Sequence, residues 1–290
     1  MRILVTGGAG FIGTHLVEKL KKDQHEVMVV DRKLGQDITD LKSLRLIFKT
    51  NRFNSVVHLA AETGVRQSWQ DADKYIKTNI VGTHNLWRLM GEFGVRQIIF
   101  ASSSSVYGKR GGGRGWLETD LPAPVSPYAA TKVAGEALCQ VYAKETGIKT
   151  TVLRFFTVYG PGNRQDMAAF TFTRDILAGV SINLFGKNTK RDLTFIDDII
   201  DGIVRAIVLP FDYEVINLGN SQPVKIIQLI EEIEKTAGKK AKINRESLPA
   251  GDVPVTFANI DKAKRLLSWQ PQTSLKIGVE KLVEWYKLRS

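Results

Sequence analysis

Apolar and polar positions alternate regularly along the first half of the chain. Short apolar runs that are rich in β-branched residues, or bracketed by turn formers, are typical of strands buried on both faces. Such runs cover residues 2–6, 26–30, 55–58, 97–101 and 150–153. Helical patterns between them cover residues 11–22, 39–50, 71–93 and 126–146. This order predicts an α/β fold with a doubly wound parallel sheet and right-handed crossovers.

The regular alternation ends near residue 155. Helical patterns then follow near residues 168–178, 196–208, 223–237 and 275–289, with short strands and loops between them. We expect a first domain over residues 1–155, to which residues 192–220 return. We also expect a smaller C-terminal lobe, made of residues 156–191 and 221–290, that lies over the carboxyl edge of the sheet.

The composition is that of an ordinary globular protein that can bury a full core, with 290 residues, 43% hydrophobic and 24% charged. Its one cysteine, Cys139, has no partner in the chain, so we expect a buried, inert thiol in a reducing compartment. The first apolar run is too short for a signal peptide, and no later stretch approaches a membrane span. We therefore expect a cytoplasmic protein with no membrane partner.

The formal net charge is +11, and the lysines and arginines that produce it are spread along the chain. Aromatic residues do not interleave them as single-strand binding would favour, so we predict a solvated basic surface and no nucleic-acid partner. The glycines 111–113 predict a surface loop within residues 109–115. We expect no metal site, because the sequence has no cysteine cluster and its four histidines do not have the spacing of metal ligands. The histidines are His15, His25, His58 and His84.

A glycine-rich segment follows the first predicted strand and opens the first predicted helix. Gly7, Gly10 and Gly13 permit a tight turn, let backbone amides approach a pyrophosphate and let the helix pack closely on the sheet. The second strand ends at Asp31, which can accept bonds from the adenosine ribose and repels a 2′-phosphate. The pattern predicts a Rossmann-type NAD site, and the neighbouring Arg32 leaves NADP as the alternative.

Further segments resemble motifs of the extended short-chain dehydrogenase/reductase family. They occur in the same order as in that family, along nearly the whole chain. They are the glycine spacing, Asp37-Ile38, the run from His58 to Ala61, Asn79, residues 102–108, residues 128–132, and Arg191-Asp192 followed by Asp197-Asp198. The resemblance implies that residues 1–155 bind NAD and that the C-terminal lobe binds a nucleotide sugar. It implies a cofactor site formed by Gly7, Gly10, Phe11, Ile12, Gly13, Asp31, Asp37, Ile38, Leu59, Ala60, Ala61, Asn79, Tyr128, Lys132 and Phe155.

The chemistry of sugar oxidation fits three of these residues. A base must take the hydroxyl proton while a hydride leaves carbon. Tyr128 and Lys132 are four residues apart, so both project from one face of a helix. A free tyrosine has a pKa of ~10, but a nearby ammonium and the positive nicotinamide ring both favour the phenolate. Ser103, at the end of the preceding strand, would hold the reacting hydroxyl.

The two residues after Ser103 limit which reactions the enzyme could catalyse. Sugar 4,6-dehydratases carry an acidic pair at the next two places, and nucleotide-uronate decarboxylases usually keep a glutamate at the second. This chain has Ser104 and Ser105 there, which favours simple 4-epimerisation through a 4-keto sugar. Together with residues 101–108 and 128–132, the stretch 153–168 looks most like UDP-glucuronate 4-epimerases, and galactose-type enzymes typically have asparagine in place of Thr157.

The resemblance implies that Thr157, Arg164 and the extra serines hold a hexuronate carboxylate, for which an arginine offers a planar fork. The implied substrate site comprises Ser103, Ser104, Ser105, Tyr128, Thr157, Arg164, Leu184, Phe185 and Arg191. Alternatives remain at several of these positions. Arg164 could instead contact the diphosphate or pair with Asp166, Leu184-Phe185 could be ordinary core, and the role of Arg66 stays open.

Two departures from the family pattern affect this prediction. The connection from Asp31 to Asp37 is short, whereas many relatives have a longer insertion there that changes the surroundings of the adenine. The segment 249–253 lacks an arginine that many galactose-type relatives place before their proline. The resemblance also implies a homodimer formed through the helices at 71–93 and 126–146.

The leading hypothesis is an NAD-dependent isomerase, a 4-epimerase of UDP-glucuronate. The alternatives are a 4-epimerase of neutral UDP-hexoses such as UDP-glucose, another uronate-modifying enzyme such as a decarboxylase, and a reductase that releases NADH. A non-catalytic NAD-binding regulatory protein is a further alternative, because fold alone does not imply catalysis.

Overall fold

The computed structural model of the chain describes residues 1–109, 114–248 and 253–289. It contains two compact units. Unit 1 comprises Met1–Arg110, Glu118–Phe155 and Ile200–Ile216, and unit 2 comprises Gly111–Leu117, Phe156–Ile199 and Asn217–Ser290. The predicted glycine loop at 111–113 and most of the segment 249–253 lie outside the described residues.

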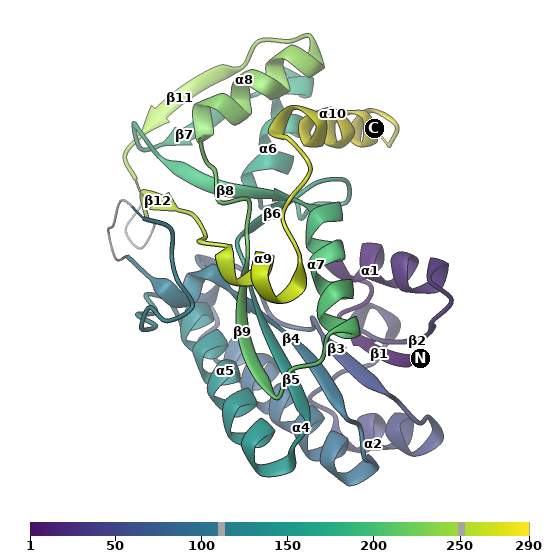
Figure 1. Cartoon of the computed structure of the whole chain (residues 1–290). Coiled ribbons are helices and arrows are strands. Elements are labelled where there is room, and N and C mark those ends of the chain that lie inside the picture. Colours follow the sequence, from purple (N-terminus) through teal and green to yellow (C-terminus); the bar gives the residue numbers. More distant parts are fainter. Residues whose placement is uncertain (110–113, 249–252, 290) are drawn as a thin grey trace. The chain divides into compact units, whose positions relative to one another are not determined.

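A six-stranded sheet with the strand order β2-β1-β3-β4-β5-β9 forms the centre of unit 1 (Figure 1). Its strands are β1 (Arg2–Thr6), β2 (Glu26–Val30), β3 (Ser55–His58), β4 (Gln97–Ser103), β5 (Lys149–Phe155) and β9 (Tyr213–Leu218). The pairs β1–β2, β1–β3, β3–β4 and β4–β5 are all parallel. The predicted parallel α/β sheet is therefore confirmed, and β4 and β5 are longer than the sequence pattern indicated.

Helices cover both faces of this sheet (Figure 1). They are α1 (Phe11–Lys22), α2 (Leu41–Thr50), α3 (Ala72–Ile76), α4 (Gly82–Phe93), α5 (Pro127–Thr146) and α7 (Ile196–Val208), the last of which begins in unit 2. The helical stretch expected over 71–93 is present from Ala72 to Phe93, but a π-helical turn at Lys77–Val81 divides it into α3 and α4. The helix expected from residue 39 begins at Leu41, because the Asp40 carboxylate accepts bonds from the amides of Lys42 and Ser43.

Local signals also set the limits of α5. The Ser126 hydroxyl accepts a bond from the Ala129 amide at 3.1 Å, and Pro127 occupies the first turn, where its missing N–H has no intrahelical partner to lose. Gly147 ends the helix in the left-handed conformation with φ of 68°. These two ends fix the phase of the helix, and therefore which residues face the sheet.

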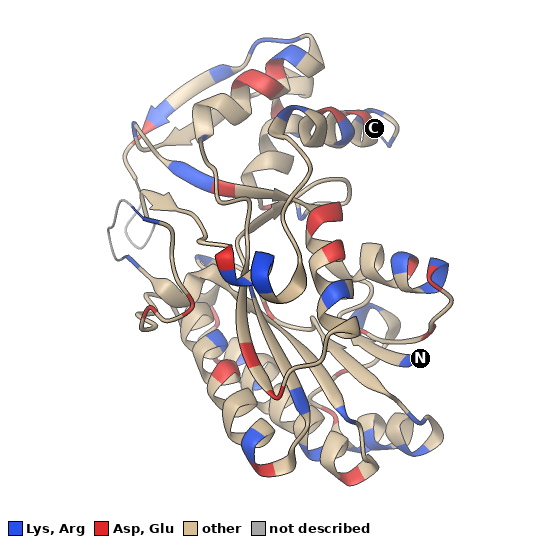
Figure 2. Cartoon of the chain, viewed as in Figure 1, with Lys and Arg blue, Asp and Glu red and all other residues tan. Residues whose placement is uncertain are grey.

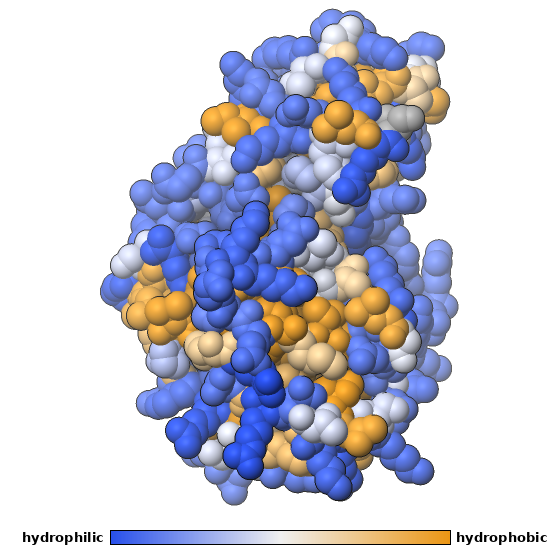
Figure 3. Space-filling model, turned by 90° about the vertical axis from the view of Figure 1, so that its right-hand side faces the viewer, coloured by the Kyte–Doolittle hydropathy of each residue, from blue (hydrophilic) through white to orange (hydrophobic). Residues whose placement is uncertain are grey.

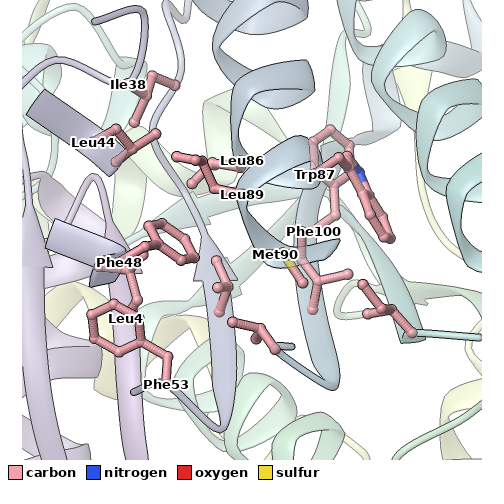
Figure 4. Close-up of a cluster of buried hydrophobic side chains, with 14 of the residues drawn as sticks. Leu4, Ile38, Leu44, Phe48, Phe53, Leu86, Trp87, Leu89, Met90 and Phe100 are labelled. Atoms are coloured by element: carbon pink, nitrogen blue, oxygen red, sulfur yellow. The ribbon is translucent and has the colours of Figure 1, made fainter. Parts of the chain in front are cut away.

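A hydrophobic core fills the space between the sheet and α2 and α4 (Figure 4). Leu44 and Phe48 of α2 meet Leu86 and Leu89 of α4 over Leu4 of β1, and all five are almost fully buried. Cys139 is also buried in this core, as expected, and burial raises the pKa of its thiol. On the face drawn in Figure 3, hydrophobic groups lie between larger hydrophilic areas, and Figure 2 shows lysines and arginines on many elements.

Unit 2 is built from short strands and helices. They are β6 (Thr157–Tyr159), α6 (Ala168–Ala178), β7 (Ser181–Phe185), β8 (Lys190–Phe195), β10 (Pro223–Lys225), α8 (Ile226–Ala237), β11 (Lys242–Glu246), β12 (Val255–Thr256), α9 (Asp261–Leu267) and α10 (Leu275–Lys287). Strand β8 pairs with β6, β10 and β12, and β11 pairs with β7. The helix expected from residue 223 begins at Ile226, because residues 223–225 pair with β8 instead.

Two buried aspartates hold the loops of unit 2 together. The Asp192 carboxylate accepts bonds from the amides of Ser221 at 3.0 Å and Ala258 at 2.8 Å. The Asp198 carboxylate accepts bonds from the amides of Gln272 at 2.9 Å and Thr273 at 3.1 Å. These residues of the expected nucleotide-sugar signature therefore contact backbone of their own unit. Among the described residues, no helix is long and apolar enough to cross a membrane.

Asp197 and Asp198 offer a matched pair for measuring this effect. Both lie in the first turn of α7, but Asp197 is exposed and pairs with Lys281, whereas Asp198 is buried. We expect Asp198→Ala to lower the free energy of unfolding by ~2–4 kcal/mol, because two backbone amides lose a buried, charged acceptor. Asp197→Ala should cost less than ~1 kcal/mol, as surface ion pairs do. Urea denaturation measures both, and equal losses would contradict this role of Asp198.

Candidate functional site

The glycine turn after β1 brings the backbone of three segments into close contact. Gly7 has a φ of 74°, and a Cβ atom there would lie 2.6 Å from the Ala60 nitrogen. A Cβ atom on Gly13 would lie 2.1 Å from the Gly7 carbonyl oxygen. Neither site can accept a side chain without moving backbone. The turn thus fits the close approach of a pyrophosphate to the amides at the start of α1, where Phe11 and Ile12 lie.

Asp31 connects the end of β2 to this glycine turn. Its carboxylate accepts bonds from the amides of Ala9 at 3.0 Å and Lys33 at 2.9 Å. The short connection that follows is a single 3-10 turn at Arg32–Leu34. Arg32 pairs with Glu62, and the Lys33 ammonium donates to the Ala9 carbonyl at 3.0 Å. The expected ribose contact therefore lies beside two cations.

The other predicted cofactor residues lie along the same edge of unit 1. The Asp37 carboxylate accepts a bond from the Thr39 amide at 2.8 Å, and Asn85 donates to the Ile38 carbonyl at 3.1 Å. Ile38 is buried, and its side chain belongs to the hydrophobic core. Leu59, Ala60 and Ala61 follow β3 and are half-buried, and Phe155 ends β5.

A chain of buried polar side chains links this edge to α5, the helix that carries Tyr128 and Lys132. Thr6 contacts His58 at 2.7 Å, His58 contacts Thr83 at 2.9 Å, and the Thr83 hydroxyl donates to the Asn79 carbonyl at 2.6 Å. The Asn79 side-chain amide donates to the Thr131 hydroxyl at 2.9 Å and so reaches α5. Sequence reasoning singled out Asn79 but missed the roles of the others. Polar residues within otherwise buried patterns were the available signal.

Tyr128 and Lys132 lie on one face of α5, as their spacing predicted. The Lys132 nitrogen is 6.0 Å from the centre of the Tyr128 ring and donates to the Ala101 carbonyl at 2.7 Å. Burial lowers the pKa of Lys132 to about 8, and the Glu136 carboxylate acts in the opposite direction. The structure therefore holds an ammonium beside the Tyr128 ring, an arrangement that favours the phenolate.

The serine run lies at the end of β4, in the same unit. The Ser103 hydroxyl accepts a bond from the Ser105 amide at 3.2 Å and donates to the Ser105 hydroxyl at 3.1 Å. Ser104 begins the 3-10 turn Ser104–Tyr107 that continues from the strand. Ser103, the predicted catalytic serine, is thus fixed by its own loop, and the structure has hydroxyls at residues 104 and 105.

A buried ion pair lies behind these groups and was missed from the sequence. The Arg154 guanidinium of β5 donates to both oxygens of Glu136, at 2.9 Å and 2.7 Å. Ser102 also donates to Glu136, and Arg154 lies 4.8 Å above the Tyr107 ring. Both charges are nearly fully buried. The pair joins α5, β4 and β5, the three elements that carry Lys132, Ser103 and Phe155.

The remaining predicted substrate residues belong to unit 2. Thr157 begins β6, Leu184 and Phe185 end β7, and Arg191 lies in β8. Leu184 is buried and the Phe185 side chain is half-buried. Arg191 donates to the Lys190 carbonyl at 2.9 Å.

Arg164 forms a forked ion pair with Asp166, whose nearer contact is 2.7 Å. The hydrogen bond from Arg164 lowers the pKa of Asp166. The structure therefore contains the ion pair that was the alternative role for Arg164.

The role of Arg66 stays open, and this residue of unit 1 precedes a 3-10 turn. Among the described residues, no group of three or more histidine, cysteine or acidic side chains could hold a metal ion.

Comparison with known proteins agrees with this geometry. A family model described as the NAD dependent epimerase/dehydratase family matches residues 3–219. A UDP-glucuronate 4-epimerase from Thermodesulfobacterium geofontis is 41% identical over 98% of this chain and 95% of its own length.

Two solved structures are similar over essentially the whole chain. The UDP-glucose 4-epimerase of Thermotoga maritima with UDP-glucose has a TM-score of 0.96 at 32% identity, covering 100% of this chain and 99% of its own. The UDP-glucuronic acid 4-epimerase of Bacillus cereus with UDP-glucuronic acid and NAD has a TM-score of 0.93 at 36% identity, covering 100% of both chains. The predicted family is confirmed: the chain belongs to the NAD-dependent epimerase/dehydratase family of extended short-chain dehydrogenase/reductases.

Proposed function

We propose that this protein is an NAD-dependent UDP-glucuronate 4-epimerase. The observation that carries the proposal is the combination of Tyr128 and Lys132 on one helix face with hydroxyls, not carboxylates, at residues 104 and 105. These groups suffice for reversible oxidation of a sugar hydroxyl and provide no acidic pair for dehydration. Two of the three relatives named above, the enzymes of Thermodesulfobacterium geofontis and Bacillus cereus, support the choice of a uronate.

Each catalytic residue has one task in the proposed mechanism. Tyr128, as phenolate, accepts the proton of the sugar 4-hydroxyl, and Ser103 orients that hydroxyl by hydrogen bonding. Lys132 stabilises the phenolate through its positive charge. Bound NAD supplies the hydride acceptor and, after the 4-keto sugar has turned over, the hydride donor. Tyr128 then returns its proton to the oxygen at C4, which completes the inversion.

Unit 1 binds the cofactor in this proposal, through Gly7, Gly10, Gly13 and Asp31 in particular. Unit 2 binds the nucleotide sugar, with Leu184, Phe185 and Arg191 on the nucleotide and diphosphate. Within unit 2, Thr157 and Arg164 hold the hexuronate carboxylate in this proposal, because an arginine fork matches a carboxylate. The buried single cysteine supports our proposal that the enzyme works in the reducing cytoplasm.

The substrate is tested directly by proton NMR. We expect purified protein with NAD to convert UDP-glucuronate into UDP-galacturonate, without net NADH release, and to leave UDP-glucose unchanged. Turnover of UDP-glucose alone would keep the mechanism and contradict the uronate. A UDP-pentose product would indicate decarboxylation, and no turnover of either sugar would contradict the proposed function.

Removing one hydroxyl tests the proposed base. Tyr128→Phe should lower kcat by ~10²–10⁴-fold, because general-base catalysis contributes about that much. The content of bound NAD, measured after denaturation, should stay close to that of the wild type. Tyr286→Phe deletes the same atom from a tyrosine that packs on Phe170 and should keep full activity. An active Tyr128→Phe protein would assign the base to another residue.

We also propose that the enzyme is a homodimer formed through α4 and α5. Ile76, Val81 and Val141 leave 47%, 44% and 65% of their area exposed on or beside these helices. Trp87 of α4 stacks on Tyr142 of α5 with ring centres 5.3 Å apart, so the two helices offer one rigid surface. Exposed apolar side chains on such a surface favour association.

Charge introduced on this surface tests the dimer. Val141→Glu should halve the mass measured by light scattering after gel filtration, because a buried unpaired carboxylate opposes association. Leu46→Glu, which charges an equally exposed residue of α2, should leave the mass unchanged. The same dimer mass for both variants would place the interface elsewhere.

A further inference from the structure

The segment after β2 carries conflicting signals for the choice of cofactor. Asp31 is the residue type that binds an unmodified adenosine ribose, whereas an arginine nearby can accommodate the 2′-phosphate of NADP. Arg32 and Lys33 follow Asp31 directly. Both oxygens of Asp31 already accept backbone amides, from Ala9 and Lys33. What Arg32 contacts therefore decides whether this segment can hold a phosphate.

Glu62 binds Arg32 in this structure. The two side chains form an ion pair, and the Lys74 ammonium lies 3.3 Å from the same carboxylate. Glu62 leaves 15% of its side chain exposed, compared with 46% for Arg32 and 50% for Lys74. The anion is therefore the sheltered partner, and the two cations reach it from more exposed positions.

The backbone of Glu62 is held in place by one side chain. Asn79 accepts a bond from the Glu62 amide at 2.7 Å and donates to the Glu62 carbonyl at 3.0 Å. Asn79 is itself buried and bonded to Thr131 of α5. The position of Glu62 thus does not depend on its own ion pairs, and a change of its charge should leave its backbone in place.

The Arg32–Glu62 pair crosses the region that the cofactor site requires. Strands β2 and β3 are the two neighbours of β1, and Arg32 follows β2 while Glu62 follows β3. A contact between these two segments passes the carboxyl end of β1, where the glycine turn lies. In sheets of this type the dinucleotide binds at that edge.

We propose that Glu62 determines the selectivity for NAD over NADP. It does so by holding Arg32 away from the ribose. A 2′-phosphate would then meet the Asp31 carboxylate and no available arginine. The inference rests on the cofactor site of the proposed function, but not on the identity of the sugar.

Competition between the two dinucleotides tests this role without measuring activity. Purified protein is incubated to constant composition with equal amounts of deuterium-labelled NAD and NADP, freed of unbound nucleotide, denatured and analysed by mass spectrometry. Nucleotide that the protein carried from purification has no deuterium. The NADP-to-NAD ratio is therefore calculated from the deuterium-labelled nucleotides alone. We expect Glu62→Gln to raise the NADP-to-NAD ratio at least tenfold over the wild type.

Four further variants make the result specific. Arg32→Met alone should leave the ratio unchanged, because Glu62 already occupies this arginine, and Glu62→Gln with Arg32→Met should return the ratio to the wild-type value. Such non-additivity is the signature of two coupled residues. Glu92→Gln, which frees Arg45 from a similar surface pair, should have no effect. Glu62→Ala removes the same charge and guards against a folding defect peculiar to glutamine.

An unchanged ratio in both Glu62 variants would overturn the inference, as would a raised ratio that survives the loss of Arg32. These outcomes are independent of the sugar assay. A protein that fails to epimerise UDP-glucuronate but shows the tenfold change would refute the proposed substrate and retain the role of Glu62.

Discussion

The arrangement of unit 1 depends on a chain of buried hydrogen bonds that begins at Thr6 and ends at α5. Its directions are determined by chemistry. The Thr83 hydroxyl gives its proton to a carbonyl, so it must accept from His58, and the other His58 nitrogen must accept from Thr6. This pattern needs a neutral imidazole. Burial, assisted by the charge of Lys132, lowers the pKa of His58 to about 3, so the imidazole is neutral at physiological pH.

A satisfied chain of this kind has a mechanical consequence. Each member is buried, so breaking one bond leaves a polar group without a partner, which costs ~1–3 kcal/mol. The glycine turn, the loop after β3 and the catalytic helix are therefore held in one register. Asn79 has a central place, because its side chain bonds Glu62 on one side and Thr131 on the other. The π-helical turn supplies the backbone from which Asn79 does so.

The sequence predicted the strands and helices of unit 1 well because their signals are local. Strands buried on both faces appear as apolar runs, and the ends of α5 carry their own cap residues. The π-helical turn could not be predicted, because the apolar pattern continues through Lys77–Val81. The pairs Glu136–Arg154 and Arg32–Glu62 were also invisible, since their partners are distant along the chain. In unit 2, strands of two or three residues such as β12 and β10 are too short to show a period.

The observed Arg164–Asp166 pair does not conflict with a carboxylate role for Arg164. The two side chains are 35% and 39% exposed, and ion pairs at such positions contribute at most ~1 kcal/mol. A substrate carboxylate offers the same fork geometry, so replacing Asp166 exchanges one charge-assisted contact for another. In the structure, Asp166 holds the Arg164 guanidinium through two hydrogen bonds, and a side chain already held in this way loses less entropy on binding. By contrast, Arg154 is buried with Glu136 and cannot be released at comparable cost, so it fixes structure, whereas the proposed exchange at Arg164 would break only a half-exposed ion pair.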